Sequence, residues 1–176
     1  AASAYKQLLP YKAEYHRIVL LGSTHRVAVT GVVVPEAEYF STPLGMVKLA
    51  ADHIKRMVNA GIAQYDDNAH KFEHSLEVQL PFIQKVFTDI EVIPVLMGEL
   101  SIEQAVQFLH SVWGEADTLI IVSSDLSHYH SATAAGIIMS GVAVAQSQGA
   151  YLYRGIMRRV LSFRPACRTL PEASAT

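Results

Sequence analysis

Three histidines stand where the side chains of a folded protein often do chemistry. His25 follows the apolar segment 17–22, His128 follows the apolar segment 118–122, and His74 lies at the mouth of an expected helix. Imidazole nitrogens are suitable ligands for iron, copper and zinc. Because ligands of an open α/β sheet bind outside the carboxyl ends of its strands, we expect these three side chains to line one metal-centred pocket.

Carboxylates accompany these histidines along the chain. Asp125 precedes His128 by three residues, and Glu73 and Glu77 flank His74. If the segment around His74 is helical, the two glutamates lie on one face and His74 can share Glu77. A carboxylate that accepts a ring N–H fixes the tautomer of a metal-binding histidine. We therefore expect one or more of these carboxylates to support the pocket.

A hydrolase is a competing interpretation of the same region. The string His70-x-x-Glu73-His74 fits the H-x-x-E-H pattern of inverted zinc proteases, in which a helix presents two histidines to zinc and the glutamate acts as general base. This zinc hydrolase would need His70 and would give His25 no role. The polar residues at 66–68 argue against it, because they favour a loop at His70.

The other histidines have ordinary explanations. His16, His53 and His110 stand in polar or helical surface contexts, where an isolated histidine is more often a surface or hydrogen-bonded structural residue. We assign them no function.

The segments between these residues alternate between strand and helix. The apolar runs at 17–22 and 118–122 are typical of parallel strands buried on both faces. Val27–Val34 predicts another strand because it is rich in β-branched residues. Ile90–Met97 predicts a fourth strand, in which Pro94 favours an edge or a bulge. The pattern predicts an α/β fold with a mostly parallel or mixed sheet flanked by helices.

Helical spacing of apolar residues marks the intervening segments. We expect a helix that ends at Pro10, a helix over Ser75–Phe87 with Pro81 either in its first turn or at a kink, and a helix over Ala105–Val112 preceded by a capping box of Ser101 and Gln104. Pro43 is expected to open a long amphipathic helix that ends at Gly61. Its apolar face would comprise Leu44, Val47, Ala50, Ile54 and Val58.

Composition restricts the class of protein. The 176 residues are 51% hydrophobic and 17% charged, with a formal net charge of -2, which is typical of a globular domain with a sizeable core. Basic and aromatic residues do not interleave, so we expect no nucleic-acid partner. No apolar run reaches membrane-spanning length, so we expect no membrane partner. With Cys167 as the single cysteine, the chain suits the reducing cytoplasm.

Four blocks of the sequence follow a familiar order. They are LGSTHR at 21–26, EHSLEVQLPF at 73–82, IPVLMG at 93–98 and SSDLSHY at 123–129. These blocks resemble the Memo family, whose bacterial and archaeal members are called AmmeMemoRadiSam system protein B. Four blocks in order are far more specific than any single motif.

The resemblance implies a fold related to the class III extradiol ring-cleaving dioxygenases and a pocket in which two histidines and a cysteine bind iron or copper. Carried over by motif, His25 and His74 would bind the metal. Asp125 and His128 would move protons or contact substrate in the same pocket. The resemblance specifies no reaction, so a metal-dependent oxidoreductase and a non-catalytic module that binds a peptide or another small ligand both stay open. It also implies radical-SAM and AMMECR-type partner proteins.

The resemblance weakens toward the end of the chain. We expect a single Memo-like domain over 1–176 that is family-like over about 1–135 and divergent over 136–176. The family cysteine stands in a C-G-x-x-P context that Cys167 does not match, so Cys167 is not assigned as a ligand. The chain lacks an initiator Met and the first strand of the family, so we expect a fragment that is incomplete at both ends. One hypothesis is that the tail is read out of frame, which the parent DNA would test.

Overall fold

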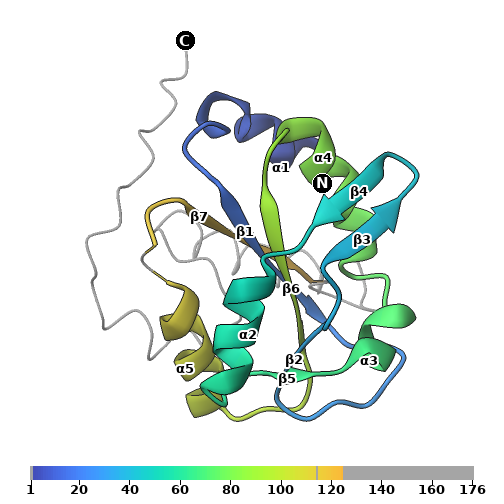
Figure 1. Cartoon of the computed structure of the whole chain (residues 1–176), viewed down its shortest axis with the longest axis vertical. Coiled ribbons are helices and arrows are strands. Elements are labelled where there is room, and N and C mark those ends of the chain that lie inside the picture. Colours follow the sequence, from blue (N-terminus) through green and yellow to red (C-terminus); the bar gives the residue numbers. More distant parts are fainter. Residues whose placement is uncertain (1, 114, 125–176) are drawn as a thin grey trace, which may run out of the picture. The chain divides into compact units, whose positions relative to one another are not determined.

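A mixed five-stranded sheet forms the centre of the fold. The computed structural model describes residues 2–113 and 115–124. The strands lie in the order β5-β2-β6-β1-β7 (Figure 1). Their bounds are β1 Arg17–Ser23, β2 Val32–Val34, β5 Gln64–Tyr65, β6 Glu91–Met97 and β7 Thr118–Ser123. β1 is parallel to β6 and β7, whereas β2 is antiparallel to β6 and parallel to β5. The expected α/β class with a mixed sheet flanked by helices is confirmed.

β1 is buried along nearly its whole length, as is its neighbour β6. Ile18, Val19 and Leu20 have no exposed surface and Leu21 is 2% exposed, so both faces of the strand are covered. The continuous apolar run predicted this burial. β7 was expected to be equally buried, but its side chains are mostly half-buried and Val122 is 46% exposed. The difference follows from its place at the end of the strand order, where it pairs with β1 alone among the described strands.

β6 corrects the prediction made from Pro94. The strand lies inside the sheet between β1 and β2, and Pro94 stands opposite Leu20 of β1. An interior position is tolerated because the ladder with β2 reaches only Leu96 and Met97. The β2 side of the strand at Pro94 therefore lacks regular pairing, and the missing N–H of proline costs no ladder bond there.

β2 is shorter than the strand expected over 27–34. Only Val32–Val34 is strand, and Gly31 has a φ of 79°, which breaks the extended run. Gly31 donates a backbone hydrogen bond to Glu99. β-branched composition alone therefore overestimated the length of the strand.

A hairpin replaces the first part of the helix expected from Pro43. β3 Tyr39–Thr42 and β4 Gly45–Lys48 pair antiparallel, and Pro43 lies in the turn between them. The side chain of Thr42 binds the backbone of Leu44 and Gly45, and Gly45 has a φ of 115°. A positive φ favours glycine and cannot belong to a helix. The helix α2 begins only at Ala51 and ends at Asn59.

Seven helical segments accompany the strands in the described part of the chain, namely α1 Ala2–Gln7, η1 Leu9–Tyr11, α2 Ala51–Asn59, α3 Asp67–Lys71, η2 Glu77–Gln79, α4 Leu80–Val86 and α5 Ile102–Val112. Pro81 lies in the first turn of α4, which settles the alternative left open by the sequence. The predicted capping box of Ser101 and Gln104 is confirmed at the start of α5. α1 lies beside α4 (Figure 1), where the rings of Tyr5 and Phe82 stack.

Within residues 2–113 and 115–124, no helix combines the length and apolar character needed to cross a bilayer.

Candidate metal centre

The carboxyl end of β1 and the segment that follows α3 meet at very close range. The hydroxyl of Ser75 donates a hydrogen bond to the backbone oxygen of Ser23, at 3.0 Å. Gly22 makes this approach possible, because a Cβ there would lie 2.5 Å from the Ser75 Oγ and 2.6 Å from a methyl carbon of Leu76. The glycine that ends the apolar run therefore has a packing role, and it brings His74 to the loop that carries His25.

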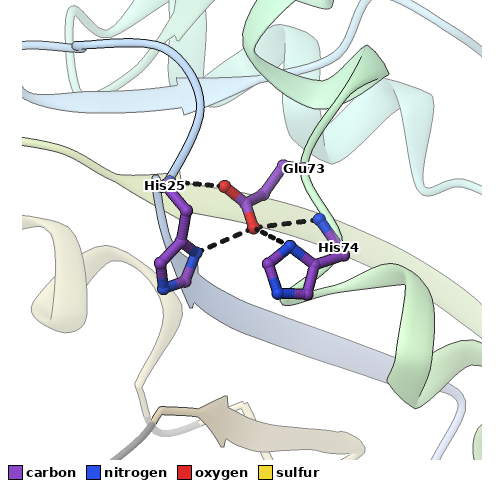
Figure 2. Close-up of side chains that lie close together, drawn as sticks. All are labelled: His25, Glu73 and His74. Atoms are coloured by element: carbon purple, nitrogen blue, oxygen red, sulfur yellow. Dashed lines mark hydrogen bonds and ion pairs between the residues drawn. The ribbon is translucent and has the colours of Figure 1, made fainter. Parts of the chain in front are cut away.

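Glu73 joins the two segments through four hydrogen bonds, and Figure 2 shows those to His25 and His74. One carboxylate oxygen accepts from the His25 ring Nδ1 and from the backbone N–H groups of His74 and Ser75, each at 2.9 Å. The other accepts from the His25 backbone N–H at 2.6 Å. The carboxylate side chain is only 1% exposed. A carboxylate offers about four acceptor positions, so these N–H donors use nearly all of its capacity.

The electrostatics of Glu73 follow from these contacts. Burial by itself would raise the pKa of the Glu73 carboxyl, because it disfavours the charged form. The hydrogen bonds from the Ser75 backbone and from the His25 ring and backbone outweigh burial and lower the pKa to about 2. Glu73 is therefore a buried anion over the whole physiological range of pH.

The two histidines stand next to each other on the solvent side of Glu73. Their ring centroids are 5.2 Å apart, and the side chains of His25 and His74 are 41% and 58% exposed. The His74 Nδ1 lies 3.4 Å from the nearer Glu73 oxygen. One potential ligand atom from each of the three residues lies within 4.8 Å of the other two. The prediction that His25 and His74 come together is confirmed.

The donors in this group suit different tasks. Because Glu73 accepts from the Nδ1 of His25, the proton of a neutral His25 resides on Nδ1 and its Nε2 is left with a lone pair. The exposed nitrogens of His25 and His74 can therefore bind a metal ion. Glu73 fits better as the carboxylate that orients a ligand, since its acceptor positions are already filled.

One expectation for this region is wrong, and others concern residues that the structure does not describe. The segment from Glu73 to Leu76 is not helical, so Glu77 does not share a helix face with Glu73, and its side chain is exposed. The carboxylate that supports the pair is Glu73. Asp125, His128 and Cys167 lie outside the described residues. The roles of Asp125 and His128 therefore stay predictions, and Cys167 stays unassigned.

His70 is placed away from this group, which weakens the zinc hydrolase interpretation. It lies in α3 rather than in the loop that we expected, and α3 ends before Glu73. Its ring Nε2 lies 3.3 Å from the backbone oxygen of Val33, and burial lowers the pKa of the imidazole. Among the described residues, the potential ligand cluster contains His25 and excludes His70.

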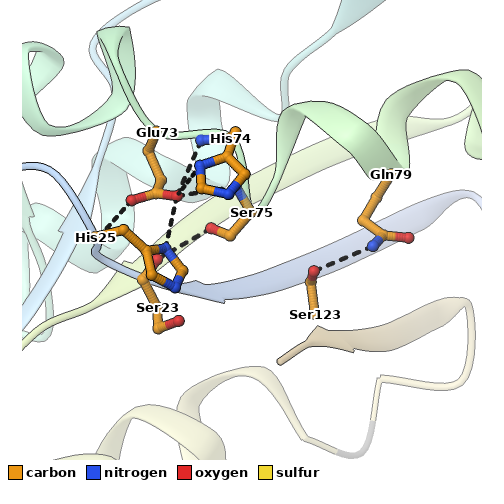
Figure 3. A network of polar contacts seen from close by, with 7 residues as sticks. All are labelled: Ser23, His25, Glu73, His74, Ser75, Gln79 and Ser123. Atoms are coloured by element: carbon orange, nitrogen blue, oxygen red, sulfur yellow. Dashed lines mark hydrogen bonds and ion pairs between the residues drawn. The ribbon is translucent and has the colours of Figure 1, made fainter. Parts of the chain in front are cut away.

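A second polar chain beside the centre was missed by sequence reasoning. The Gln79 amide donates to the hydroxyl of Ser123 at the end of β7 (Figure 3). The Tyr5 hydroxyl donates to the Gln79 carbonyl oxygen. Burial raises the pKa of Tyr5 to about 12, so the phenol stays a donor. The signal that could have found it is Gln79, a polar residue between apolar neighbours at the start of a helix.

Comparison with known proteins supports the resemblance seen in the motifs. The family model described as Memo-like protein matches residues 1–149, past the point near residue 135 where the likeness was expected to fade. A MEMO1 family protein from Aquifex aeolicus is 34% identical over 134 residues, covering 73% of this chain and 48% of the relative. One from Thermococcus onnurineus is 37% identical over 147 residues, covering 72% and 49%. One from Pyrococcus horikoshii is 36% identical over 137 residues, covering 69% and 47%.

The chain thus spans about half the length of the curated relatives that it matches. Its matched part includes all the residues of the candidate centre, His25, Glu73 and His74. On this evidence of sequence, with a family model matching most of its length, the chain belongs to the Memo-like family.

Proposed function

We propose that this protein holds a single iron or copper ion through the Nε2 of His25 and a ring nitrogen of His74. The observation that carries the proposal is the buried Glu73 carboxylate, which binds the His25 ring on its Nδ1 side and leaves the Nε2 exposed beside His74. A carboxylate partner of this kind is what metal-binding histidines use to fix their orientation.

Glu73 and the two histidines have different roles in the proposed site. Glu73 holds the proton on the Nδ1 of His25 and keeps the loop at 24–25 against the segment 73–75. His25 and His74 supply two neutral imidazole donors, which suit iron and copper ions. The bound ion would supply redox chemistry or polarise a substrate oxygen. Further ligands would come from water or from residues outside those described.

The choice of iron or copper and the wider activity rest on family membership. We infer a dioxygenase-like oxidoreductase of the cytoplasm that acts on a small molecule or a peptide, as an AmmeMemoRadiSam system protein B with radical-SAM and AMMECR-type partners. Asp125 and His128 would handle protons beside the metal. Because the chain spans about half of its curated relatives, the activity of the whole protein belongs to this proposal as well.

Metal analysis of anaerobically purified protein tests the proposal most directly. We expect about one equivalent of iron or copper, and reduction of metal binding by about 10-fold or more in His25→Ala and in His74→Ala, because each variant removes one of the two proposed imidazole ligands. His16→Ala is the matched control, since His16 is exposed and lies at the other end of β1. Titration with Fe(II), Cu(I) and Zn(II) then ranks the ions.

Two results would contradict this function. Zinc binding that is lost in His70→Ala and kept in His25→Ala would support the hydrolase instead. Protein that binds no transition metal, but binds a peptide in a way that His74→Ala weakens, would make the same surface a non-catalytic recognition site.

A further inference from the structure

A cavity of about 220 Å³ lies on the opposite end of the sheet from the histidine pair. Its floor is formed by Val19 of β1 and Ile93 of β6, and its sides come from α2 and α5, which lie next to each other in Figure 1. Arg17 and Thr118, the first residues of β1 and β7, close one end. His25 follows the other end of β1, so the two sites are separate.

The cavity is apolar inside and carries charge at its edge. Met57 and Val112 are 7% and 6% exposed and Ile62 is half-buried, so aliphatic side chains form the accessible part of the lining. A volume of this size exceeds the space of a few water molecules and is smaller than the pockets that hold drug-sized ligands. An aliphatic compound of a few carbon atoms would fit its size.

The charges that line the cavity leave one cation without a partner. Arg17 donates to the Glu115 carboxylate and to the Thr118 hydroxyl, and it also lies 3.8 Å from the Asp117 carboxylate, so its charge is compensated. The guanidinium of Arg56 makes no hydrogen bond or ion pair with any residue in the ranges 2–113 and 115–124, and its residue is exposed at the cavity edge. Arg56 is therefore the arginine of the lining that has no carboxylate partner among the described residues.

His53 stays neutral for reasons that the structure shows. Burial lowers the pKa of its imidazole, and the charges of Arg17 and Arg56 lower it further, against the opposing effect of Glu115. A neutral imidazole offers one donor and one acceptor nitrogen. The cavity edge therefore presents a free guanidinium and a neutral ring with hydrogen-bonding capacity.

We propose that this cavity binds a short-chain aliphatic carboxylate, with the alkyl chain against Met57, Ile62 and Val112 and the carboxylate at Arg56. Arginine and carboxylate pair through two parallel N–H donors, a geometry that a guanidinium provides. One guanidinium suffices for a monoanion, whereas a phosphate dianion would need a second unpaired cation, and Arg17, the other arginine of the lining, is already paired.

The test uses hexanoate as the probe and the full chain as it is, followed by amide chemical shifts in NMR spectra. Hexanol has the same chain without the charge, and acetate has the charge without the chain. We expect hexanoate to shift signals of α2 and α5 with a Kd on the order of 1 mM, and both comparison compounds to bind at least about tenfold more weakly.

Three variants locate the binding. Arg56→Gln is expected to weaken hexanoate binding about tenfold, which corresponds to about 1.4 kcal/mol for the lost charge pair. Lys55→Gln is the matched control, because Lys55 is an exposed cation on the same helix that does not line the cavity. Ala60→Leu adds a side chain at the cavity edge and should abolish binding.

The outcomes separate the proposal from its alternatives. Equal binding of hexanol and hexanoate, or unchanged hexanoate binding in Arg56→Gln, would overturn the carboxylate site. So would the absence of any hexanoate shift in the unmodified chain, or shifts confined to the segments that carry His25 and His74. Binding that survives in His25→Ala and His74→Ala would support a site independent of the proposed metal centre.

Discussion

The two ends of β1 solve the problem of a buried charge in different ways. At the carboxyl end, the buried charge is the Glu73 carboxylate, and four N–H donors satisfy it. At the amino end, the charge is the Arg17 guanidinium, which is 14% exposed and pairs with the half-exposed Glu115. Its Nε–H is buried and has no acceptor among the residues that the structure describes.

The difference indicates which end of β1 holds its side chains more rigidly. A fully satisfied carboxylate holds its neighbours in one arrangement, because any movement breaks several hydrogen bonds. A guanidinium with a solvated partner and an unused donor is held less tightly. The carboxyl end therefore suits a metal ion, which needs fixed ligands, and the amino end suits a weakly bound organic ligand.

Glu73→Gln should have the largest effect on the contrast between the two ends of β1. The amide NH₂ would face N–H donors, so we expect a loss of about 3 kcal/mol in the free energy of unfolding and of 10- to 100-fold in metal affinity. Urea unfolding and metal titration measure the two effects. Glu77→Gln, on an exposed neighbour, should change neither. If both variants behave alike, the carboxylate does not organise the centre.

Acid should weaken the carboxyl end in a defined window of pH. The pKa of Glu73 is about 2 in the folded chain, against an ordinary value of 4.5. A lowered folded pKa means that the stabilisation is complete above the unfolded value and is lost as pH falls from about 4.5 toward 2. It amounts to about 3 kcal/mol in the metal-free protein. Unfolding measured across this range should show the slope, and Glu73→Gln should lack the part due to this carboxyl.

Gly22→Ala should displace the centre by steric means. The added methyl group would overlap Ser75 and Leu76, which overpacks the contact at a cost of about 2 kcal/mol and moves His74 relative to His25. Weaker metal binding is therefore expected along with lower stability. Gly61→Ala is the comparison, because its φ of 70° makes alanine unfavourable by about 1 kcal/mol at a site with free space. Metal affinity that falls equally in both variants would contradict the steric explanation.

Glu115→Gln should produce the smallest change. The carboxylate is 45% exposed, so solvent screens its pair with Arg17, and we expect a loss of only about 0.5 kcal/mol. Metal affinity should stay the same because the change lies at the amino end of β1. A measurable loss of metal binding would show that the two ends are coupled and that the contrast drawn between them is wrong.

The sequence predicted the parts of the fold that local patterns determine. The run at 17–22 identified a buried interior strand. The positions of His25 after that strand and of His74 at the mouth of an expected helix indicated that the two side chains would meet. Glu73 was recognised as an available carboxylate. The geometry of Glu73 was not predicted. The segment around His74 is a turn instead of the expected helix, and Glu73 is held by hydrogen bonds from His25, 48 positions away, which no local pattern shows.

The failures have the same origin. Apolar residues from Leu44 to Val58 mimic a helical period, but the backbone of Gly45 and the side chain of Thr42 form a hairpin turn first. Pro94 argued for an edge, but the short reach of β2 leaves room for it inside the sheet. In each case tertiary pairing overrode a local preference.

Three of the four donors that hold Glu73 are main-chain amides, and substitution of side chains cannot remove these. Positions 25 and 74 would then keep their placement whichever residues occupy them. A cysteine or an aspartate installed at either position would be displayed toward solvent by the same anchored backbone. The backbone around Glu73 therefore allows the donor atoms at both positions to be exchanged.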